Sequence, residues 1–271
     1  MTKYQEWRLE FFKDLLSRFK KLEASLSIVV QGPLHERMRE SIPHYLNLVK
    51  KNRYKNYGNL VISHWDKDDT SIIEDFLENP LIYVKTNYYK NLPRYENSHA
   101  KRGPNPWVYQ NHTTHRGLKH ATGYLAIKVR SDEIFPALDV FYEKLVSPKF
   151  TGKFLTSDIY FRKDIAEKFH PSDHIVGGAR RNLENGFKLA ELLASTAERS
   201  KFRFPEQLIC HALLTAVNVE PKEYKSQKIM KQNFEIVPIS RMPGSIWTAS
   251  YRKYRPMTTK EDGWVQDINN L

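Results

Sequence analysis

The sequence predicts a single α/β domain with a mainly parallel central sheet flanked by helices, preceded by an N-terminal amphipathic helix. Between residues 26 and 133, short apolar runs rich in β-branched residues alternate with amphipathic stretches of helical length. Polar clusters follow three of the apolar runs, at 31–33, 64–69 and 130–133. The 271 residues contain no internal repeat or obvious linker, so one domain accounts for them better than two.

Residues 4–22 have the pattern of a strong amphipathic helix, which we treat as a separate segment over 1–25. Apolar side chains recur every three or four residues, with basic side chains between them. The apolar positions are Trp7, Phe11, Phe12, Leu15, Leu16, Phe19 and Leu22, and the basic ones are Arg8, Lys13, Arg18, Lys20 and Lys21. Two interpretations are open. The helix packs on the domain's own core, or it lies on an anionic membrane surface.

Strand and helix then alternate through the first half of the domain, about 26–133. We expect strands at 26–30, 59–63, 81–84 and 124–129, helices at 36–52, 70–77 and 108–121, and a loop at 87–106. Parallel strands joined by right-handed crossovers bind ligands beyond their carboxyl ends. The polar clusters fall at those ends and therefore predict a ligand site there.

The second half of the domain, about 134–237, is mixed. We expect a helix at 134–146, a strand at 153–161, a loop at 170–174, and helices at 183–197 and 205–216. The tail, 238–271, has no regular pattern and interleaves basic with aromatic residues. Such a tail can close over a diphosphate, contact lipid headgroups, stack on nucleic-acid bases, or be a surface strap without a ligand.

Composition narrows the class of protein. The 43 lysines and arginines exceed the 31 acidic residues and give a formal net charge of +12, which favours polyanionic partners. With 40 % hydrophobic residues the chain can form a core, and no apolar run is long enough to span a membrane. The single cysteine, Cys210, excludes an intrachain disulfide, and the first residues lack a signal-peptide pattern. We therefore expect a cytoplasmic protein.

The segment 111–132 carries the most informative pattern. Its helical part ends in Gly117-Leu118, followed by Ala121 and Gly123, a strand, and Asp132. This resembles a pattern widespread in GT-A glycosyltransferases, in which the acidic motif holds a metal and the sugar diphosphate. No Gly-rich dinucleotide turn, P-loop or nucleophile elbow occurs in the sequence.

More narrowly, the chain resembles the WavE family of lipopolysaccharide and capsule biosynthesis proteins. The segments concerned are 28–33, 128–133, 155–162 and 170–178, and the resemblance extends over about 26–215. It implies a GT-A-like (Rossmann-like) domain over 26–271. It also implies transfer of a sugar from a nucleotide sugar to a glycan or lipid-linked glycan acceptor, by a peripheral protein at the inner face of the membrane.

The acidic motif is altered in this chain. A divalent cation, Mg²⁺ or Mn²⁺, held by Asp132 would neutralise the diphosphate. The usual Asp-x-Asp has become Arg130-Ser131-Asp132, however, so the sequence leaves open whether the protein uses a metal cofactor. Arg130 can instead clamp the diphosphate directly, because its planar fork matches phosphate. Asp132 can also act simply as the N-cap of the following helix.

Other residues are candidates for nucleotide binding. Gln31, Gly32 and Pro33 resemble the nucleotide-facing end of the first strand, where Gly32 permits close approach and the Gln31 amide can pair with a base edge. Asp66, after the second strand, can accept from ribose hydroxyls, although an ordinary Asp-rich turn explains it equally well. Arg116 points either at phosphate or at solvent.

Inverting transfer needs a general base for the acceptor hydroxyl. Asp173 is the first candidate, because it matches the position of an acidic motif after the last central strand. Asp158 and Glu206 are the other two, although Glu206 begins a helix, where a carboxylate ordinarily offsets the helix dipole.

Two competing functions fit parts of the sequence. A basic nucleic-acid-binding protein is supported by the charge and the tail, but no recognition motif supports it, and we expect no nucleic-acid partner. A catalytically inactive glycan-binding homologue would explain the lost first carboxylate.

Overall fold

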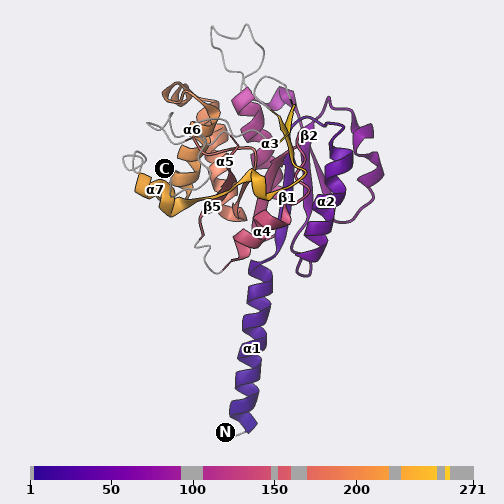
Figure 1. The fold of residues 1–271 in the computed structure, drawn as a ribbon, viewed down its shortest axis with the longest axis vertical. Coiled ribbons are helices and arrows are strands. Elements are labelled where there is room, and N and C mark those ends of the chain that lie inside the picture. The colour runs from indigo at the N-terminus through magenta and orange to yellow at the C-terminus, as the bar shows by residue number, and fades with distance from the viewer. Residues whose placement is uncertain are drawn as a thin grey trace.

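A seven-stranded sheet forms the centre of the computed structural model, in the order β3-β2-β1-β4-β6-β5-β7 (Figure 1). The structure describes residues 3–92, 106–147, 152–159, 170–219, 227–248 and 254–256. The strands are β1 (Leu26–Gln31), β2 (Leu60–Trp65), β3 (Ile82–Asn87), β4 (Leu125–Arg130), β5 (Phe154–Ser157), β6 (Val176–Ala179) and β7 (Phe234–Val237). Strands β1 to β4 are mutually parallel, β5 is parallel to β7, and β6 runs antiparallel to both of its neighbours.

The predicted α/β fold with a mainly parallel central sheet is therefore confirmed, and the register explains why the strand ends converge. Gln31 is the register partner of Ser63 on one side and of Arg130 on the other. The carboxyl ends of β1, β2 and β4 consequently lie at one edge of the sheet, which is where a ligand site is expected in this architecture.

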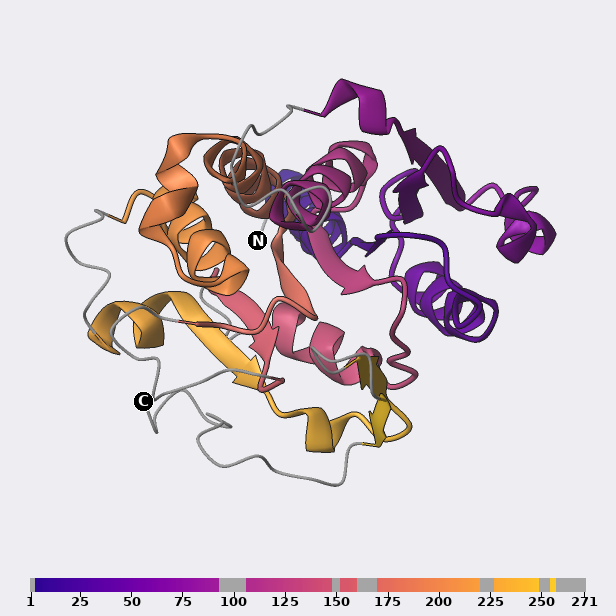
Figure 2. The same cartoon turned by 90° about the horizontal axis from the view of Figure 1, so that it is seen from above.

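Helices cover both faces of the sheet, as Figure 2 shows in a view from above. They are α2 (Met38–Lys51), α3 (Pro106–His120), α4 (Asp139–Val146), α5 (Arg180–Ala194), α6 (Pro205–Ala216) and α7 (Gln227–Asn233). Alternate residues of a strand point to opposite faces. Ile28 and Val30 accordingly join a core with α2 and α4, whereas Val29 joins a core with α3, α5 and α6.

Two strands of the sheet and one helix, β6, β7 and α7, lie outside the predicted elements. Strand β6 includes Gly177 and Gly178, which carry no β-branched signal. A Cβ on Gly177 would come within 2.6 Å of the Phe141 ring on α4, so close packing of that helix favours glycine here. The strand expected at 153–161 is regular only over 154–157, and residues 160–169 lie outside the described part of the chain.

Three other predicted elements differ in detail. The helix expected at 70–77 is two 3₁₀ turns, Thr70–Ile72 and Glu74–Phe76. The helix expected from 134 begins only at Asp139, because Ile134 forms a β-bridge with Ile246. In the tail, which we expected to be irregular, β8 (Ile246–Thr248) and β9 (Tyr254–Pro256) pair antiparallel, and the remainder from 257 onward lies outside the described residues.

Helix α1 (Lys3–Glu23) projects away from the domain (Figure 1). Phe11 and Phe19 of its apolar stripe are 51 % and 53 % exposed, and Phe12, Leu15 and Leu16 are also exposed. The interpretation in which these residues pack on the domain's own core is therefore wrong, while the side chain of Trp7 lies outside the description. In the described parts of the chain, no helix is long and apolar enough to cross a membrane.

Candidate functional site

A cavity of about 580 Å³ opens at the carboxyl ends of β1, β2 and β4. Its walls come from residues 31–35 after β1, Trp65 at the end of β2, Tyr89, the first turns of α3, and residues 130–132 at the end of β4. Its volume is in the range of small-molecule binding sites. Five parts of the chain that are separated in sequence therefore meet at this one place.

The segments after β1 and β4 are tied together at the base of this cavity. Gly32 has a φ of +120°, which side-chain-bearing residues rarely adopt, and a Cβ there would lie 2.8 Å from Ser131 Oγ. Ser131 Oγ donates to Pro33 O at 2.6 Å. Gln31 is only 4 % exposed, and its Oε1 accepts from Thr113 Oγ1 at 2.8 Å. These bonds fix the two turns that carry most of the predicted binding residues.

Arg130 and Asp132 form a bidentate ion pair beside the cavity. Arg130 donates from Nε to Oδ1 and from Nη2 to Oδ2, both at 2.9 Å, and Nε lies 3.5 Å from Oε1 of Glu133. Burial disfavours the charged guanidinium, but these carboxylates outweigh that effect and raise the pKa of Arg130. Arg37 Nη1 donates to Asp132 O at 2.8 Å. Arg130 is therefore a fixed cation at the end of β4.

The alternative role of Asp132 as a helix cap is wrong. Helix α4 begins at Asp139, and its N-cap residue, Leu138, provides no side-chain cap. An N-cap side chain must reach the backbone N–H groups of its own first turn. Asp132 lies well before that turn and engages Arg130 instead.

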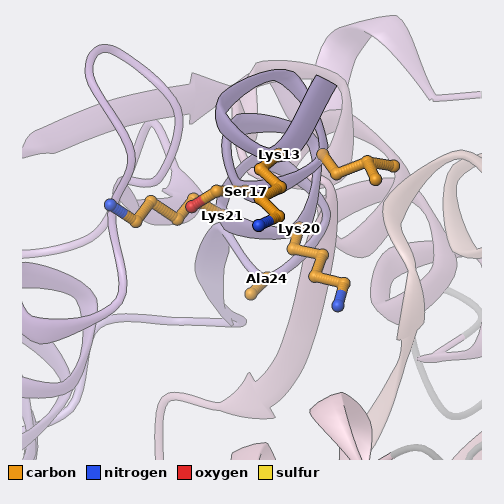
Figure 3. A pocket seen from close by; sticks show the side chains of 6 residues that line it. Lys13, Ser17, Lys20, Lys21 and Ala24 are labelled. Carbon is orange, nitrogen blue, oxygen red and sulfur yellow. The ribbon is translucent and has the colours of Figure 1, made fainter. Parts of the chain in front are cut away.

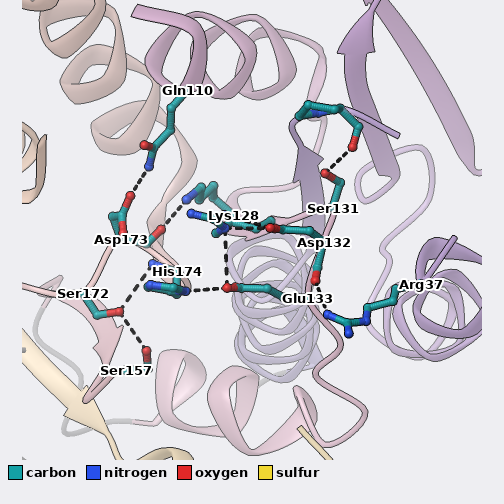
Figure 4. A network of polar contacts seen from close by, with 12 residues as sticks. Arg37, Gln110, Lys128, Ser131, Asp132, Glu133, Ser157, Ser172, Asp173 and His174 are labelled. Carbon is teal, nitrogen blue, oxygen red and sulfur yellow. Dashed lines mark hydrogen bonds and ion pairs between the residues drawn. The ribbon is translucent and has the colours of Figure 1, made fainter. Parts of the chain in front are cut away.

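A buried polar network lies behind this ion pair (Figure 4). Lys128 is fully buried and donates from Nζ to the backbone oxygen of Asp173, and Gln110 donates to Asp173 Oδ2. His174 Nδ1 lies 2.5 Å from Glu133 Oε1. Because Gln110 also lines the cavity, Asp173 is one side chain away from it.

Opposing effects set the charge of Asp173. Burial alone would raise its pKa, but electrostatic interactions with Lys128, His174 and Arg130 together hold the pKa well below its usual range. Burial lowers the pKa of Lys128, and Asp173 opposes that shift. The other carboxylate oxygen of Asp173, Oδ1, has no partner among the described residues. Asp173 is thus an anion with one oxygen able to accept a proton.

Aromatic side chains form one wall of the cavity, and no pattern in the sequence predicted them. We call Trp65, Tyr89 and Tyr109 the aromatic wall. Trp65 stacks on Tyr89 at 4.4 Å and on His112 at 5.7 Å, and Tyr109 meets both Trp65 and Tyr89 edge-on at 5.2 Å. With both faces of Trp65 covered, the partly exposed rings of Tyr89 and Tyr109 are the surfaces open to a planar ligand.

The remaining predicted residues lie elsewhere. Asp66 is exposed at the end of β2, and Arg116 is half-buried on α3, but neither lines the cavity. Asp158 is buried and accepts from the backbone N–H of Ile239 at 2.7 Å. Glu206 pairs with His170 Nε2 at 3.3 Å. The structure thus brings together Gln31, Gly32, Pro33, Arg130 and Asp132, with Asp173 linked to them through Gln110.

The residues present do not fit a carboxylate-bound divalent cation. Both carboxylate oxygens of Asp132 accept from the Arg130 guanidinium. Across the described ranges, no cluster of three His, Cys, Asp or Glu side chains has the arrangement of a metal site. Mg²⁺ and Mn²⁺ need oxygen ligands that are free to face the ion.

Solved structures of other proteins resemble this chain. Glucosyl-3-phosphoglycerate synthase from Mycobacterium tuberculosis, solved with Mn²⁺, uridine diphosphate and phosphoglyceric acid, is 14 % identical with a TM-score of 0.41 and covers 75 % of this chain and 82 % of its own. A mannosyltransferase from Pyrobaculum calidifontis, solved with GDP-Man and Mn²⁺, is 12 % identical and has a TM-score of 0.38. The match covers 77 % of this chain and 74 % of the mannosyltransferase. HddC from Yersinia pseudotuberculosis is 9 % identical and has a TM-score of 0.33. The match covers 59 % of this chain and 79 % of HddC. No family model and no curated protein sequence matches the chain.

Proposed function

We propose that this protein is a glycosyltransferase that binds a nucleotide sugar in the cavity at the ends of β1, β2 and β4. One observation carries the proposal: a fixed guanidinium and an aromatic wall share one cavity of about 580 Å³. A nucleotide sugar requires this combination, because it joins a planar base to a doubly charged diphosphate. The catalytically inactive homologue is the competing outcome, and a transfer assay distinguishes the two.

Each part of the donor has a matching group in the cavity. The base stacks on Tyr89 or Tyr109, and Gly32 lets the diphosphate approach the backbone. Charge accumulates on the leaving diphosphate as the bond to the sugar breaks, and Arg130 stabilises that charge. The guanidinium is already held in place by Asp132, so it needs no rearrangement during the reaction.

Asp173 is the general base in this proposal. In an inverting transfer, the acceptor oxygen attacks the anomeric carbon, its proton passes to Asp173 Oδ1, and the nucleoside diphosphate leaves. Asp158 and Glu206 suit this role less well, because each is engaged away from the cavity, with Ile239 and His170 respectively.

The proposed function is tested by screening nucleotide sugars against the full chain. We expect one donor of a panel of UDP-, GDP-, ADP-, CDP- and dTDP-sugars to raise the melting temperature by roughly 5 °C or more. Saturation at about 100 times Kd adds about 2.7 kcal/mol of stability. Release of the nucleoside diphosphate in the presence of glycan acceptors then measures transfer.

A gel shift with DNA and RNA at increasing salt is the parallel assay for the nucleic-acid alternative. Trp247 of the tail is 1 % exposed and packs edge-on against His174, so it cannot stack on bases. Tight nucleic-acid binding without stabilisation by any nucleotide sugar would contradict the proposed function.

The acceptor we propose is a lipid-linked glycan of lipopolysaccharide or capsule, as the resemblance to the WavE family implies. Helix α1 supports this choice. Its apolar side chains are exposed, and Lys13, Lys20 and Lys21 surround a shallow hollow on its side (Figure 3). An exposed apolar stripe flanked by lysines matches the surface of an anionic membrane, where such an acceptor would be presented.

If α1 binds membranes, mutation of its apolar side chains should reduce binding to lipid vesicles. Replacing Phe12 and Phe19 together with serine should lower the fraction that sediments with phosphatidylserine-containing vesicles at least about tenfold, because burial of each ring in lipid contributes roughly 1.5–3 kcal/mol. Leu192→Ser is the matched control, since Leu192 is 58 % exposed on α5, away from α1. High salt should also weaken binding. Equal sedimentation of the double variant and the control would show that α1 is not the anchor.

A further inference from the structure

We infer that this site neutralises the donor diphosphate with Arg130 in place of a carboxylate-bound divalent cation, so that nucleotide binding needs no metal. The inference rests on the proposed function, because it concerns the same cavity. It also gives Asp132 a different task, which is to hold Arg130 in position.

The first observation behind this inference is that Arg130 engages both carboxylate oxygens of Asp132. Its two oxygens each accept from Arg130 at 2.9 Å, which is the bidentate arrangement of a strong ion pair. A divalent cation would have to lie about 2.0–2.6 Å from one of these oxygens. It would then displace the guanidinium or sit beside its positive charge. Either requirement weakens a metal site at Asp132.

The neighbouring positions offer no replacement ligand. Among the described residues that line the cavity, Asp132 is the only one with a carboxylate. Ser131 Oγ donates to Pro33 O. Glu133 is fully buried and contacts Arg130 and His174, and neither Glu133 nor Asp173 lines the cavity. Among the described residues, a cation in the cavity would therefore meet one carboxylate, and Arg130 already neutralises it.

Arg130 has what the diphosphate requires. Its Nε and Nη2 atoms contact Asp132 and Glu133, whereas Nη1 has no partner in the part of the chain that is described. Its side chain is 30 % exposed and lines the cavity. The carboxylates of Asp132 and Glu133 thus bind the Nε and Nη2 edge of the guanidinium, and Nη1 remains to donate to phosphate oxygens. A planar guanidinium forms paired hydrogen bonds with phosphate.

This arrangement separates the effects of two substitutions. Arg130→Ala removes the charge that contacts phosphate. Asp132→Asn removes a negative charge from the cavity but leaves the guanidinium, so affinity for a diphosphate should be kept or increased. Turnover should nevertheless fall, because Arg130 loses the partner that orients it. If Asp132 were instead a metal ligand, Asp132→Asn would lower the affinity for the nucleotide.

The test is calorimetric titration of UDP, GDP, ADP, CDP and dTDP into the full chain, with excess EDTA and with MnCl₂. We expect the affinity of the best nucleotide to agree within about threefold between the two buffers. Arg130→Ala should lower it at least about tenfold in both, and Asp132→Asn should not lower it in EDTA. Arg181→Ala is the matched control, because Arg181 is exposed on α5, whose first residue is bonded to Tyr124 at the opposite end of β4. Arg130→Lys, which keeps the charge, replaces Arg130→Ala if circular dichroism shows that the alanine variant is unfolded.

The possible results separate failure of this inference from failure of the proposed function. If Mn²⁺ increases affinity more than about tenfold and Asp132→Asn removes the gain, a cation binds at Asp132. The inference is then overturned while the proposed function stands. If Arg130→Ala and Arg130→Lys both leave affinity unchanged, Arg130 does not contact the diphosphate, and the inference also fails. If no nucleoside diphosphate binds in either buffer, the proposed function itself is contradicted.

Discussion

Replacing Asp173 with asparagine is expected to lower kcat for sugar transfer by roughly 10²- to 10⁴-fold, the usual contribution of a general base. Asparagine has nearly the same shape and can still accept from Gln110, but it cannot take a proton. KM for the donor should change by less than about threefold, because in this proposal Asp173 acts on the acceptor and does not line the donor cavity. Steady-state kinetics with varied donor measures both constants.

Asp158→Asn is the matched comparison for this variant. Asp158 is as buried as Asp173, and asparagine there can still accept from the N–H of Ile239, so its effect on kcat should be far smaller. A kcat for Asp173→Asn within about threefold of the natural protein would show that Asp173 is not the base.

The pH profile gives an independent check. A base loses activity as pH falls through its pKa, and Lys128, His174 and Arg130 hold the pKa of Asp173 below its ordinary value of 3.8 despite its burial. Activity should therefore show no acid limb from Asp173 between neutral pH and about pH 5. An acid limb near neutral pH that disappears in Asp173→Asn would contradict the assigned charge state.

Replacing Arg130 with alanine is expected to lower kcat/KM by at least about 100-fold, the scale of losing one electrostatic contact with the transition state. Arg130→Lys should retain part of the activity, because lysine keeps the charge but lacks the planar fork. Both variants should be assayed in EDTA and in MnCl₂, with the release of nucleoside diphosphate as the readout.

Stability must be measured alongside activity for the Arg130 variants. Removing one partner of a buried ion pair costs about 3–5 kcal/mol, and the fully buried Glu133 would lose its contact with Arg130 here. A thermal melt of each variant separates lost folding from lost catalysis. If folded Arg130→Lys and Arg130→Ala are both as active as the natural protein, Arg130 has no role in transfer.

The sheet from β1 to β4 could be predicted from sequence because its signal is local. A parallel strand covered by helices on both faces is a short, continuous run of apolar, largely β-branched residues, as Ile28, Val29 and Val30 show. Once the strands are parallel, their carboxyl ends must share an edge. That geometric necessity placed Gln31, Gly32, Pro33, Arg130 and Asp132 around one cavity.

Strand β6 and the aromatic wall could not be predicted in this way, because their causes lie in other parts of the chain. Gly177 is in a strand because the Phe141 ring of α4 leaves no room for a Cβ above it. Trp65, Tyr89 and Tyr109 belong to separate elements, and only the packing of α3 against β2 and β3 brings them together. No short sequence window contains either arrangement.

Local patterns in the sequence predict the parallel strands, the edge at which a ligand can bind, and the residue types present at that edge. How those residues are used depends on the packing of the folded domain. Asp132 engages Arg130 instead of capping α4, and α1 leaves its apolar stripe exposed instead of covering the domain. The physical reason is that periodicity reflects the backbone of one element. Ion pairing and side-chain burial depend instead on distances of a few ångströms between elements far apart in the chain.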